Sequence, residues 1–334
     1  MDTFFDSSWY YLRFTDAINN KKPFDKKNTD YWMPLDFYTG GAEHACMHLI
    51  YARFFSKALR DLGYVSYSEP FKKLYNQGMV HCEDGYVMSK SRGNVVDPIK
   101  VSDNYSADSL RFFLVSVASP DKDFAWSQTG LESSFKTLNR IYNYVESYKN
   151  GKTSERILSK LHKTIKAVTE EIETQKYNLS VIKIRELFDS FEEEMSKKDL
   201  ELAVKLLVPF CPHLAEELWE KLKNKPFISN ESWPRFDETK INEELEKQDQ
   251  QIEGTLRDIR NIFKILKERE NKEASKVYLY VIPKELDLYK TNLNRIKESL
   301  NVYVEIYVNN DPKKHDPQNK AAKAKFGKPA VYLE

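Results

Sequence analysis

The sequence predicts an α/β region, then a long all-α region, then a short second α/β region. Three observations lead to this fold class. Over residues 1–100, short apolar and aromatic runs alternate with a helical segment. Over residues 131–270, apolar residues recur at intervals of three and four. Over residues 271–334, two strand-like runs flank one helical segment.

The first region contains two strand-like runs, DFYT at 36–39 and QGMVHC at 77–82. Between them, residues 43–63 have the pattern of a helix, and Gly63 is a typical residue just after a helix end. The run YSADSLRFFLVSVA at 105–118 predicts a further helix.

The middle region carries two apolar stripes at helical spacing. They consist of Ile157, Leu161, Ile165, Val168 and Ile172, and of Ile252, Leu256, Ile259, Phe263 and Leu266. Such stripes are typical of the packing seams of a helix bundle, so no chemistry is assigned to them.

The last region begins with a predicted strand at 277–282 and contains a second at 302–308. The segment 283–300 between them starts with proline, which suits a first helical position. Residues 313–328 hold six lysines and one aspartate. Alone, this run predicts a solvated tail; beside other polyanion-binding features it becomes a candidate contact to a phosphate backbone.

The composition is that of a soluble globular protein, with 334 residues, 41% hydrophobic, 31% charged and a net charge of +1. No apolar run approaches the roughly 18 residues of a membrane span, and the N-terminus lacks a secretory pattern, so no membrane partner is predicted. The three cysteines, Cys46, Cys82 and Cys211, are far apart. This spacing favours a reducing cytoplasmic location over a disulfide framework.

The segment YTGGAEHACMH, residues 38–48, is the first candidate site. A strand that ends in Gly40 and Gly41 and leads into a helix lets a ligand approach bare backbone at a helix N-terminus, which favours anions and nucleotides. Glu43 on the first turn is suited to bind two ribose hydroxyls. His44 and His48 are four residues apart and share one helical face.

A metal site is the alternative interpretation of this histidine pair. Zinc hydrolases with this spacing carry glutamate directly after the first histidine, whereas Ala45 follows His44 here. No metal is therefore predicted. A purely structural pair inside a packed helix remains open for either histidine taken alone.

The segment FFDSSWYYLRF, residues 4–14, combines aromatic residues with serines. It is compatible with an ordinary core and with an apolar small-molecule pocket that contains a few polar groups. By itself it favours the core.

The segment EDGYVMSKSRGNVVDP, residues 83–98, gathers hydroxyls and cations on a glycine-flanked loop. These groups are Ser89, Lys90, Ser91 and Arg92, followed by Gly93. They indicate an anion site, most simply for phosphate. The loop is not a P-loop, because the G-x-x-x-x-G-K-[ST] run is missing.

Taken in order, these motifs resemble the class I aminoacyl-tRNA synthetases, and more narrowly the leucyl-tRNA synthetases. The resemblance covers roughly residues 1–235. It also includes EPFKKLYNQGMV (69–80), PFCPHLAEELWE (209–220) and SWP (232–234). The last sixty residues match more loosely and are similar to an archaeal-type ending of this enzyme.

The resemblance implies four parts. They are the second half of a Rossmann-type catalytic domain at 1–100, a connecting region of stem-contact type at 101–130, a helical tRNA-binding bundle at 131–270, and a small α/β domain with a basic tail at 271–334. The family activates leucine with ATP, supplied with Mg²⁺, to leucyl-adenylate and transfers leucine to tRNA(Leu). ATP, leucine and tRNA(Leu) are thus the implied partners.

The resemblance also assigns residues. The leucine pocket would be lined by Phe4, Ser7, Tyr10 and His48. The ATP-binding residues would be Gly40, Gly41, Glu43, His44, Gln77, Met88, Ser89, Lys90 and Ser91. Lys90 matches the second lysine of the family's mobile KMSKS loop and would be the catalytic residue, because it stabilises the leaving pyrophosphate.

The chain departs from the family pattern at two points. Val87 stands where the family has the first loop lysine, a loss of an electrostatic contact that can cost on the order of 3 kcal/mol. No HIGH motif is present. The six histidines are His44, His48, His81, His162, His213 and His315. We therefore expect the chain to be inactive alone and to need an N-terminal half that carries the HIGH motif and the editing domain. The alternative is a non-catalytic, tRNA-binding remnant of a synthetase.

Overall fold

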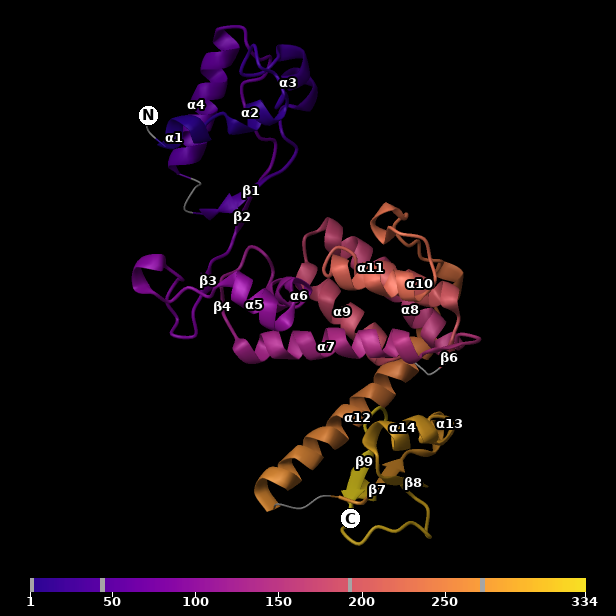
Figure 1. Cartoon of the computed structure of the whole chain (residues 1–334). Helices are drawn as coiled ribbons and strands as arrows, with labels where there is room; N and C mark the ends of the chain where they lie inside the picture. Colours follow the sequence, from indigo (N-terminus) through magenta and orange to yellow (C-terminus); the bar gives the residue numbers. More distant parts are fainter. Residues whose placement is uncertain (1–2, 43–45, 192–193, 271–273) are drawn as a thin grey trace. The chain divides into compact units, whose positions relative to one another are not determined.

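The computed structural model describes residues 3–42, 46–191, 194–270 and 274–334 (Figure 1). The chain forms two compact units. The first unit comprises residues 1–151 and 164–235, and the second comprises residues 152–163 and 236–334. None of the helices in the described ranges is long and apolar enough to cross a membrane.

The first unit begins with helices around a two-stranded parallel sheet. The elements are α1 (Thr3–Ser7), α2 (Tyr10–Phe14), α3 (Lys26–Trp32), β1 (Tyr38–Gly41), α4 (Met47–Asp61) and β2 (Leu74–Gln77). Tyr11, Leu12, Met33 and Ala52 form the buried cluster that joins α2, the end of α3 and α4. The strand predicted at 36–39 is present as β1, but it begins two residues later than predicted.

Helix α4 confirms most of the helix predicted at 43–63, although its first three residues, 43–45, lie outside the described part of the chain. The C-terminal end of this helix is the one that the following glycine predicts. Gly63 has a φ of +81°, and its N–H donates to the carbonyl of Arg60 at 2.9 Å. The N–H of Tyr64 donates to the carbonyl of Leu59 at 2.8 Å. A left-handed residue after the last turn satisfies the final helical carbonyls in this way.

A second small sheet and a glycine-rich turn follow. Strand β3 (Val80–His81) is parallel to β4 (Phe124–Ala125), and a short 3₁₀ helix, η2 (Lys90–Arg92), lies between them in sequence. Helix α5 (Pro98–Tyr105) starts with Pro98, and the Asp97 carboxylate accepts from the N–H of Ile99 at 2.9 Å. Helix α6 (Ala107–Val117) confirms the helix predicted around 105–118.

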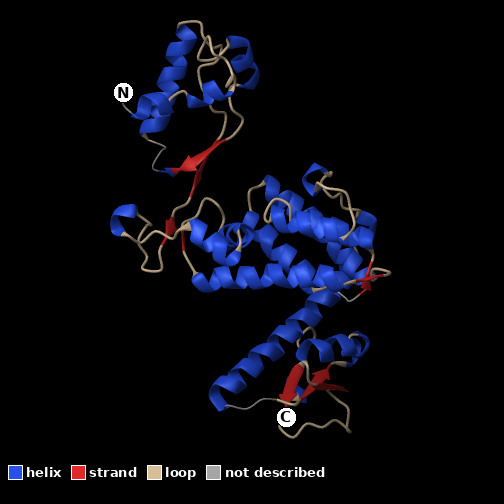
Figure 2. Cartoon of the chain, viewed as in Figure 1, coloured by secondary structure: helices blue, strands red, loops and turns tan. Residues whose placement is uncertain are grey.

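Helices make up nearly all the rest of the first unit (Figure 2). The elements are α7 (Gln128–Ser147), β5 (Lys149–Asn150), α8 (Glu155–Glu173), α9 (Tyr177–Asp189), β6 (Glu194–Met195), α10 (Lys197–Lys205), α11 (Pro212–Lys221) and η3 (Ile228–Asn230). The boundary between the units falls within α8. Its predicted stripe is confirmed as a packing seam, since Leu161, Ile165 and Val168 are fully buried.

The second unit packs helices against a three-stranded sheet of order β8-β7-β9. Its elements are η4 (Glu238–Lys240), α12 (Glu243–Glu270), β7 (Lys276–Val281), η5 (Pro283–Glu285), α13 (Leu286–Thr291), α14 (Leu293–Leu300), β8 (Tyr303–Val308), η6 (Ala321–Lys323) and β9 (Ala330–Leu333). Strand β7 pairs parallel with β8 and antiparallel with β9. Both predicted strands are confirmed, whereas β9 was not predicted.

Three details of this unit correct the sequence analysis. The second apolar stripe is not a bundle seam, because Ile252, Leu256 and Ile259 on α12 share one core with Val277 and Leu279 of β7. The segment 283–300 is not one helix but η5, α13 and α14 in succession.

The lysine run at 313–328 is not a free tail, which is the third correction. The run lies between β8 and β9, and Ala321 and Ala324 in it pack against the buried Tyr278 and Tyr280 of β7. The Asp316 carboxylate holds the start of η6 by accepting from the N–H groups of Lys320 and Ala321. The lysine side chains therefore project from a folded segment.

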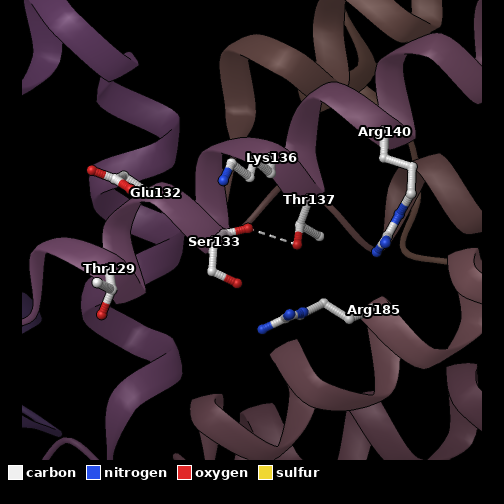
Figure 3. A pocket seen from close by; sticks show the side chains of 7 residues that line it. All are labelled: Thr129, Glu132, Ser133, Lys136, Thr137, Arg140 and Arg185. Carbon is white, nitrogen blue, oxygen red and sulfur yellow. Dashed lines mark hydrogen bonds between the residues drawn. The ribbon is translucent and has the colours of Figure 1, made fainter. Parts of the chain in front are cut away.

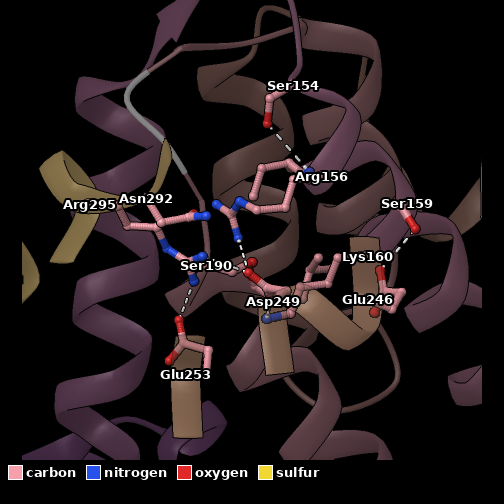
Figure 4. Close-up of polar contacts among 12 residues, drawn as sticks. Ser154, Arg156, Ser159, Lys160, Ser190, Glu246, Asp249, Glu253, Asn292 and Arg295 are labelled. Carbon is pink, nitrogen blue, oxygen red and sulfur yellow. Dashed lines mark hydrogen bonds and ion pairs between the residues drawn. The ribbon is translucent and has the colours of Figure 1, made fainter. Parts of the chain in front are cut away.

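A buried ion cluster ties three helices of this unit together (Figure 4). Asp249 of α12 accepts from Arg295 of α14 at 2.7 Å and from Arg156 of α8 at 3.0 Å. Lys160 of α8 lies 3.3 Å from the other carboxylate oxygen. Burial alone would raise the pKa of Asp249, but the three cations together lower it. The pairing compensates the cost of burying the charges.

Candidate functional site

The diglycine of β1 lies beside β2. In the parallel register Gly40 is opposite Asn76, and Gly41 is opposite Gln77. A Cβ on Gly40 would meet no described atom within 4 Å, so the backbone at this point is open to a ligand. The structure thus brings together three of the predicted ATP-binding residues, Gly40, Gly41 and Gln77.

Gly78, directly after β2, is required for a different reason. A Cβ there would lie 2.1 Å from the carbonyl oxygen of Lys122. The Gly78 N–H donates to the carbonyl of Pro120 at 2.8 Å. Next to it, the Asp123 carboxylate accepts from the N–H of Met79 at 2.7 Å, which lowers the pKa of Asp123. These contacts fix the path of the chain between β2 and β3.

A chain of hydrogen bonds joins two of the predicted leucine-binding residues. The hydroxyl of Tyr38 bonds to the hydroxyl of Tyr10 at 2.8 Å and to Nε2 of His48 at 2.7 Å. His48 is buried on α4, and Tyr10 lies on α2. Tyr38 is therefore the functional candidate that the sequence analysis missed. Its sequence signal was its position two residues before the diglycine.

The position of Tyr38 is fixed by ring stacking. Its ring is parallel to that of Phe71 with centroids 3.8 Å apart, and Phe71 also packs edge-on against Tyr11. Burial and the hydrogen bond with Tyr10 raise the pKa of Tyr38. Burial likewise raises the pKa of Tyr11 to about 12. Both hydroxyls are therefore neutral hydrogen-bonding groups at neutral pH.

The serine- and lysine-bearing loop is a folded turn. His81 pairs with Val87, and Gly85 with a φ of +82° closes the hairpin between them. The Asn94 side chain accepts from the N–H of Ser89 at 2.8 Å, and Gly93 with a φ of +70° ends η2. The loop therefore keeps its shape through contacts among its own residues.

Within this loop the predicted residues have different surroundings. Ser89 and Ser91 hydroxyls bond to each other at 2.8 Å. Lys90 is exposed, and its ammonium forms no ion pair or hydrogen bond within the described ranges. Met88 instead packs its side chain against a cluster that contains Phe113 and Trp126. Its contact with ATP stays a prediction.

The other predicted residues are only partly tested by these positions. Ser7 is half-buried at the end of α1. Phe4 lies in α1, but its side chain is outside the description. Glu43 and His44 fall within residues 43–45 and lie outside the described residues. The expected proximity of Glu43 and Lys90 therefore stays a prediction. In the described part of the chain, no group of three His, Cys, Asp or Glu side chains is arranged to hold a metal ion.

The motif PFCPH is held in place by α6. Asp108 of α6 accepts from the N–H of Leu214 at 2.6 Å and contacts Nδ1 of His213 at 3.0 Å. Arg111, one turn later, donates to the carbonyls of Pro209 and Phe210. These bonds fix the start of α11 against the segment that follows the loop.

Two family models match the chain. The model described as tRNA synthetases class I (I, L, M and V) matches residues 1–127. The model described as anticodon-binding domain of tRNA ligase matches residues 154–278. Together they confirm the predicted fold class, an α/β part of a class I catalytic domain followed by a helical domain.

Curated relatives are named leucine--tRNA ligase. The protein of Thermosipho melanesiensis is 43% identical over 265 residues, which are 72% of this chain and 32% of the relative. The protein of Petrotoga mobilis is 37% identical over 317 residues, 86% of this chain and 38% of the relative. The chain thus spans about a third of the length of the curated relatives it matches.

Solved structures agree. The ternary complex of agnB2 LeuRS, tRNA and LeuAMS from Agrobacterium radiobacter K84 superposes with a TM-score of 0.65 at 33% identity, over 72% of this chain and 34% of that one. Methionyl-tRNA synthetase of Mycobacterium tuberculosis bound by methionyl-adenylate, at 17% identity and a TM-score of 0.51 over 67% of this chain and 50% of that one, shares the fold alone. By these matches the chain belongs to the leucine--tRNA ligase family of class I tRNA synthetases.

Proposed function

We propose that this chain supplies part of the catalytic centre and the tRNA-binding bundle of a leucine--tRNA ligase. The reaction is the ATP-dependent formation of leucyl-adenylate, followed by transfer of leucine to tRNA(Leu) in the cytoplasm. The single observation that carries the proposal is the β1–β2 register, which sets Gly41 opposite Gln77. An open glycine strand beside a polar side chain suits the edge of a nucleotide.

In this proposal ATP binds along the diglycine strand. Gly40, Gly41 and Gln77 contact the adenosine, and Glu43 and His44 complete that part of the site. The bare backbone at Gly40 allows the close approach that a side chain would prevent. ATP is a substrate that arrives with Mg²⁺.

Leucine binds beside the strand in a pocket lined by Phe4, Ser7, Tyr10 and His48. Tyr38 acts as a positioning residue, since its hydroxyl bonds to both Tyr10 and His48. The neutral tyrosines offer hydrogen bonds without adding charge next to an apolar side chain.

Lys90 is the proposed catalytic residue. A leucine carboxylate oxygen attacks the α-phosphorus of ATP, and the bond to the pyrophosphate oxygen breaks in line. Negative charge grows on the leaving pyrophosphate, and an exposed ammonium on a glycine-bounded loop is suited to neutralise it. Ser89 and Ser91 donate hydrogen bonds to the same phosphates.

The proposal requires a further segment that carries the HIGH motif and the editing domain. An exposed apolar face on α4 supports such a partner. Four residues at positions i, i+3, i+4 and i+7 form this face, namely Met47, Ile50, Tyr51 and Phe54. Ile50 is 65% and Phe54 69% exposed. A contiguous apolar face of this kind is typical of a surface that another segment covers.

Leucine-dependent exchange of pyrophosphate into ATP tests the activation step. We expect no exchange with this chain alone and recovery after addition of a polypeptide that carries the HIGH motif. In the recovered mixture, Lys90→Ala should lower the exchange rate about a hundredfold, because the variant removes one electrostatic contact to the transition state. Robust exchange by the chain alone contradicts the need for the partner.

The second candidate function is a tRNA-binding remnant without catalysis. Val87 favours it, since the family has a loop lysine at this position. The same variant decides between the two functions. If the mixture recovers exchange and Lys90→Ala leaves the rate unchanged, the loop has no catalytic role and the proposal for Lys90 fails.

A further inference from the structure

A basic pocket of about 430 Å³ opens between α7 and α9 in the first unit. Its lining residues are Thr129, Glu132, Ser133, Lys136, Thr137, Arg140 and Arg185 (Figure 3). Six of the seven lie along one face of α7, at intervals of one, three or four residues, and Arg185 comes from α9. Hydroxyls and cations from two helices therefore share one cavity.

The charges in this pocket do not balance. Three cations line it against one carboxylate, that of Glu132. Arg140 also forms an ion pair with Asp189 outside the lining. Lys136 and Arg185 form no ion pair or hydrogen bond with any residue that the structure describes, and Arg185 is half-buried. A half-buried guanidinium that faces other cations favours an anion in the space between them.

The pocket lacks the features of a nucleotide site. None of its seven lining side chains is aromatic or large and apolar, so it offers no ring on which a base could stack. Cations and hydroxyls are instead the groups that contact phosphate oxygens in nucleic-acid complexes.

We infer that this α7–α9 pocket binds a phosphodiester of the RNA backbone. The inference deepens the proposed function and rests on it, because it assigns a contact within the RNA-binding part. Helix α7 lies between residues 127 and 154, where neither family model matches, whereas Arg185 on α9 lies within the residues that the anticodon-binding model matches. Lys136 and Arg185 contact the phosphate, and Ser133 donates a hydrogen bond to it.

Fluorescence anisotropy of a labelled tRNA(Leu) transcript, titrated with the full chain at several salt concentrations, tests the inference. The double variant Lys136→Met/Arg185→Met removes both charges and keeps the aliphatic stems. We expect binding to weaken about tenfold at 0.1 M salt. The slope of log K against log salt should shrink by about one for each phosphate that the variant no longer neutralises.

Two matched variants accompany the double variant. Lys198→Met removes an exposed lysine of α10 that forms no ion pair with any residue the structure describes and does not line the pocket. It should leave affinity and slope unchanged within about twofold. Glu132→Gln removes the one carboxylate of the lining, so it should strengthen binding severalfold. Lys136→Met alone is measured as well, because it removes one charge, as Lys198→Met does. A general effect of net charge predicts equal changes for these two single variants.

The outcomes separate cleanly. Unchanged affinity and slope in the double variant would overturn the pocket as a phosphate site. A loss of affinity for Lys198→Met equal to that for Lys136→Met would overturn it too. Absence of any salt-dependent binding by the unaltered chain would overturn it as well. A full response to ATP or inorganic phosphate as competitors at micromolar concentration would assign the pocket to a free anion instead. Because pyrophosphate exchange requires no RNA, its recovery with the HIGH-carrying partner tests the proposed activity separately.

Discussion

At the scale of single residues, two glycines near the diglycine strand meet opposite surroundings. Gly40 has open space where a side chain would begin, whereas Gly78 has the carbonyl of Lys122 there. The backbone at Gly40 is open to a ligand, whereas Gly78 allows the close approach of two backbone segments in the folded chain. Substitution by alanine therefore separates binding from stability.

We predict that Gly78→Ala lowers the free energy of unfolding by about 1–3 kcal/mol, because its methyl group forces the backbone at Lys122 to move. Urea unfolding followed by circular dichroism measures this change. Gly40→Ala is the matched control and should change stability by less than about 0.5 kcal/mol. It should instead weaken ATP binding. Equal stability of both variants would contradict the close approach at Gly78.

Tyr11 gives a prediction of pH dependence. Burial raises its pKa to about 12, so the stability that it contributes is complete below its unfolded value near 10 and is lost as the pH rises toward 12. Tyr11→Phe loses the 3.3 Å hydrogen bond to Ser56 and should be less stable than the parent chain at pH 8. The deficit should shrink by about 1 kcal/mol at pH 11. A deficit that is the same at both pH values, measured by urea unfolding, contradicts the role of Tyr11.

Part of the site could be predicted from sequence. The diglycine pattern indicated Gly40 and Gly41, the family resemblance assigned Gln77, and β-sheet pairing brings the three together. Tyr38 was missed, because only the folded chain brings its hydroxyl between Tyr10 and His48, which come from two different helices. A contact between distant positions has no periodic signal in sequence.

At the scale of elements, the cluster around Asp249 holds α8, α12 and α14 of the second unit together. Asp249→Asn should lower the free energy of unfolding by about 3 kcal/mol or more, because it leaves Arg156, Lys160 and Arg295 without their shared partner. Lys163→Met is the control. This variant breaks a 3.4 Å ion pair between Lys163, which is 47% exposed, and Glu246. It should lower the free energy of unfolding by less than about 1 kcal/mol.

Acid sensitivity provides an independent check of the Asp249 cluster. The pKa of this carboxyl is lowered in the folded chain, so its stabilisation is complete above its unfolded value near 3.9 and is lost as the pH falls through the folded pKa. The thermal unfolding temperature of the parent chain should therefore fall steeply in that range, and Asp249→Asn should show a shallower fall. Identical profiles would contradict the cluster's role.

Helical periodicity predicts the existence of a seam but not its partner. The stripes on α8 and α12 look alike in sequence, yet the stripe on α12 packs on the sheet of the second unit. Segment 283–300 shows a related limit. Asn292 ends α13, and its side-chain amide donates to the carbonyl of Leu288, so the chain turns where the apolar pattern continues. Local capping competes with periodicity at such points.

At the scale of the whole molecule, the apolar face of α4 predicts how the chain associates. Ile50→Glu/Phe54→Glu places two charges on this face without disturbing a buried residue. We expect the variant to fold normally and to lose association with the proposed HIGH-carrying partner by a hundredfold or more, because unpaired charges in an interface are costly. Size-exclusion chromatography with light scattering measures the complex.

The control for this prediction is Ile182→Glu, at a 45% exposed position on α9. It should leave the complex intact. If the α4 variant associates as well as this control, another surface binds the partner.

The overall order of an α/β part, a helical part and a small α/β part was predictable from sequence, because each has its own apolar period. The antiparallel strand β9 was not, since its four residues follow a lysine-rich segment.

The anchoring of Met88 has a spectroscopic consequence. The side chain that precedes Ser89 and Lys90 lies in the same cluster as Trp126, whose indole is 5.1 Å from the ring of Phe113. Any displacement of the loop that withdraws this thioether alters the polarity around one indole and exposes apolar surface at a cost of about 1 kcal/mol. In a variant that keeps Trp126 as its sole tryptophan, emission wavelength would then report the position of the loop, with no added dye.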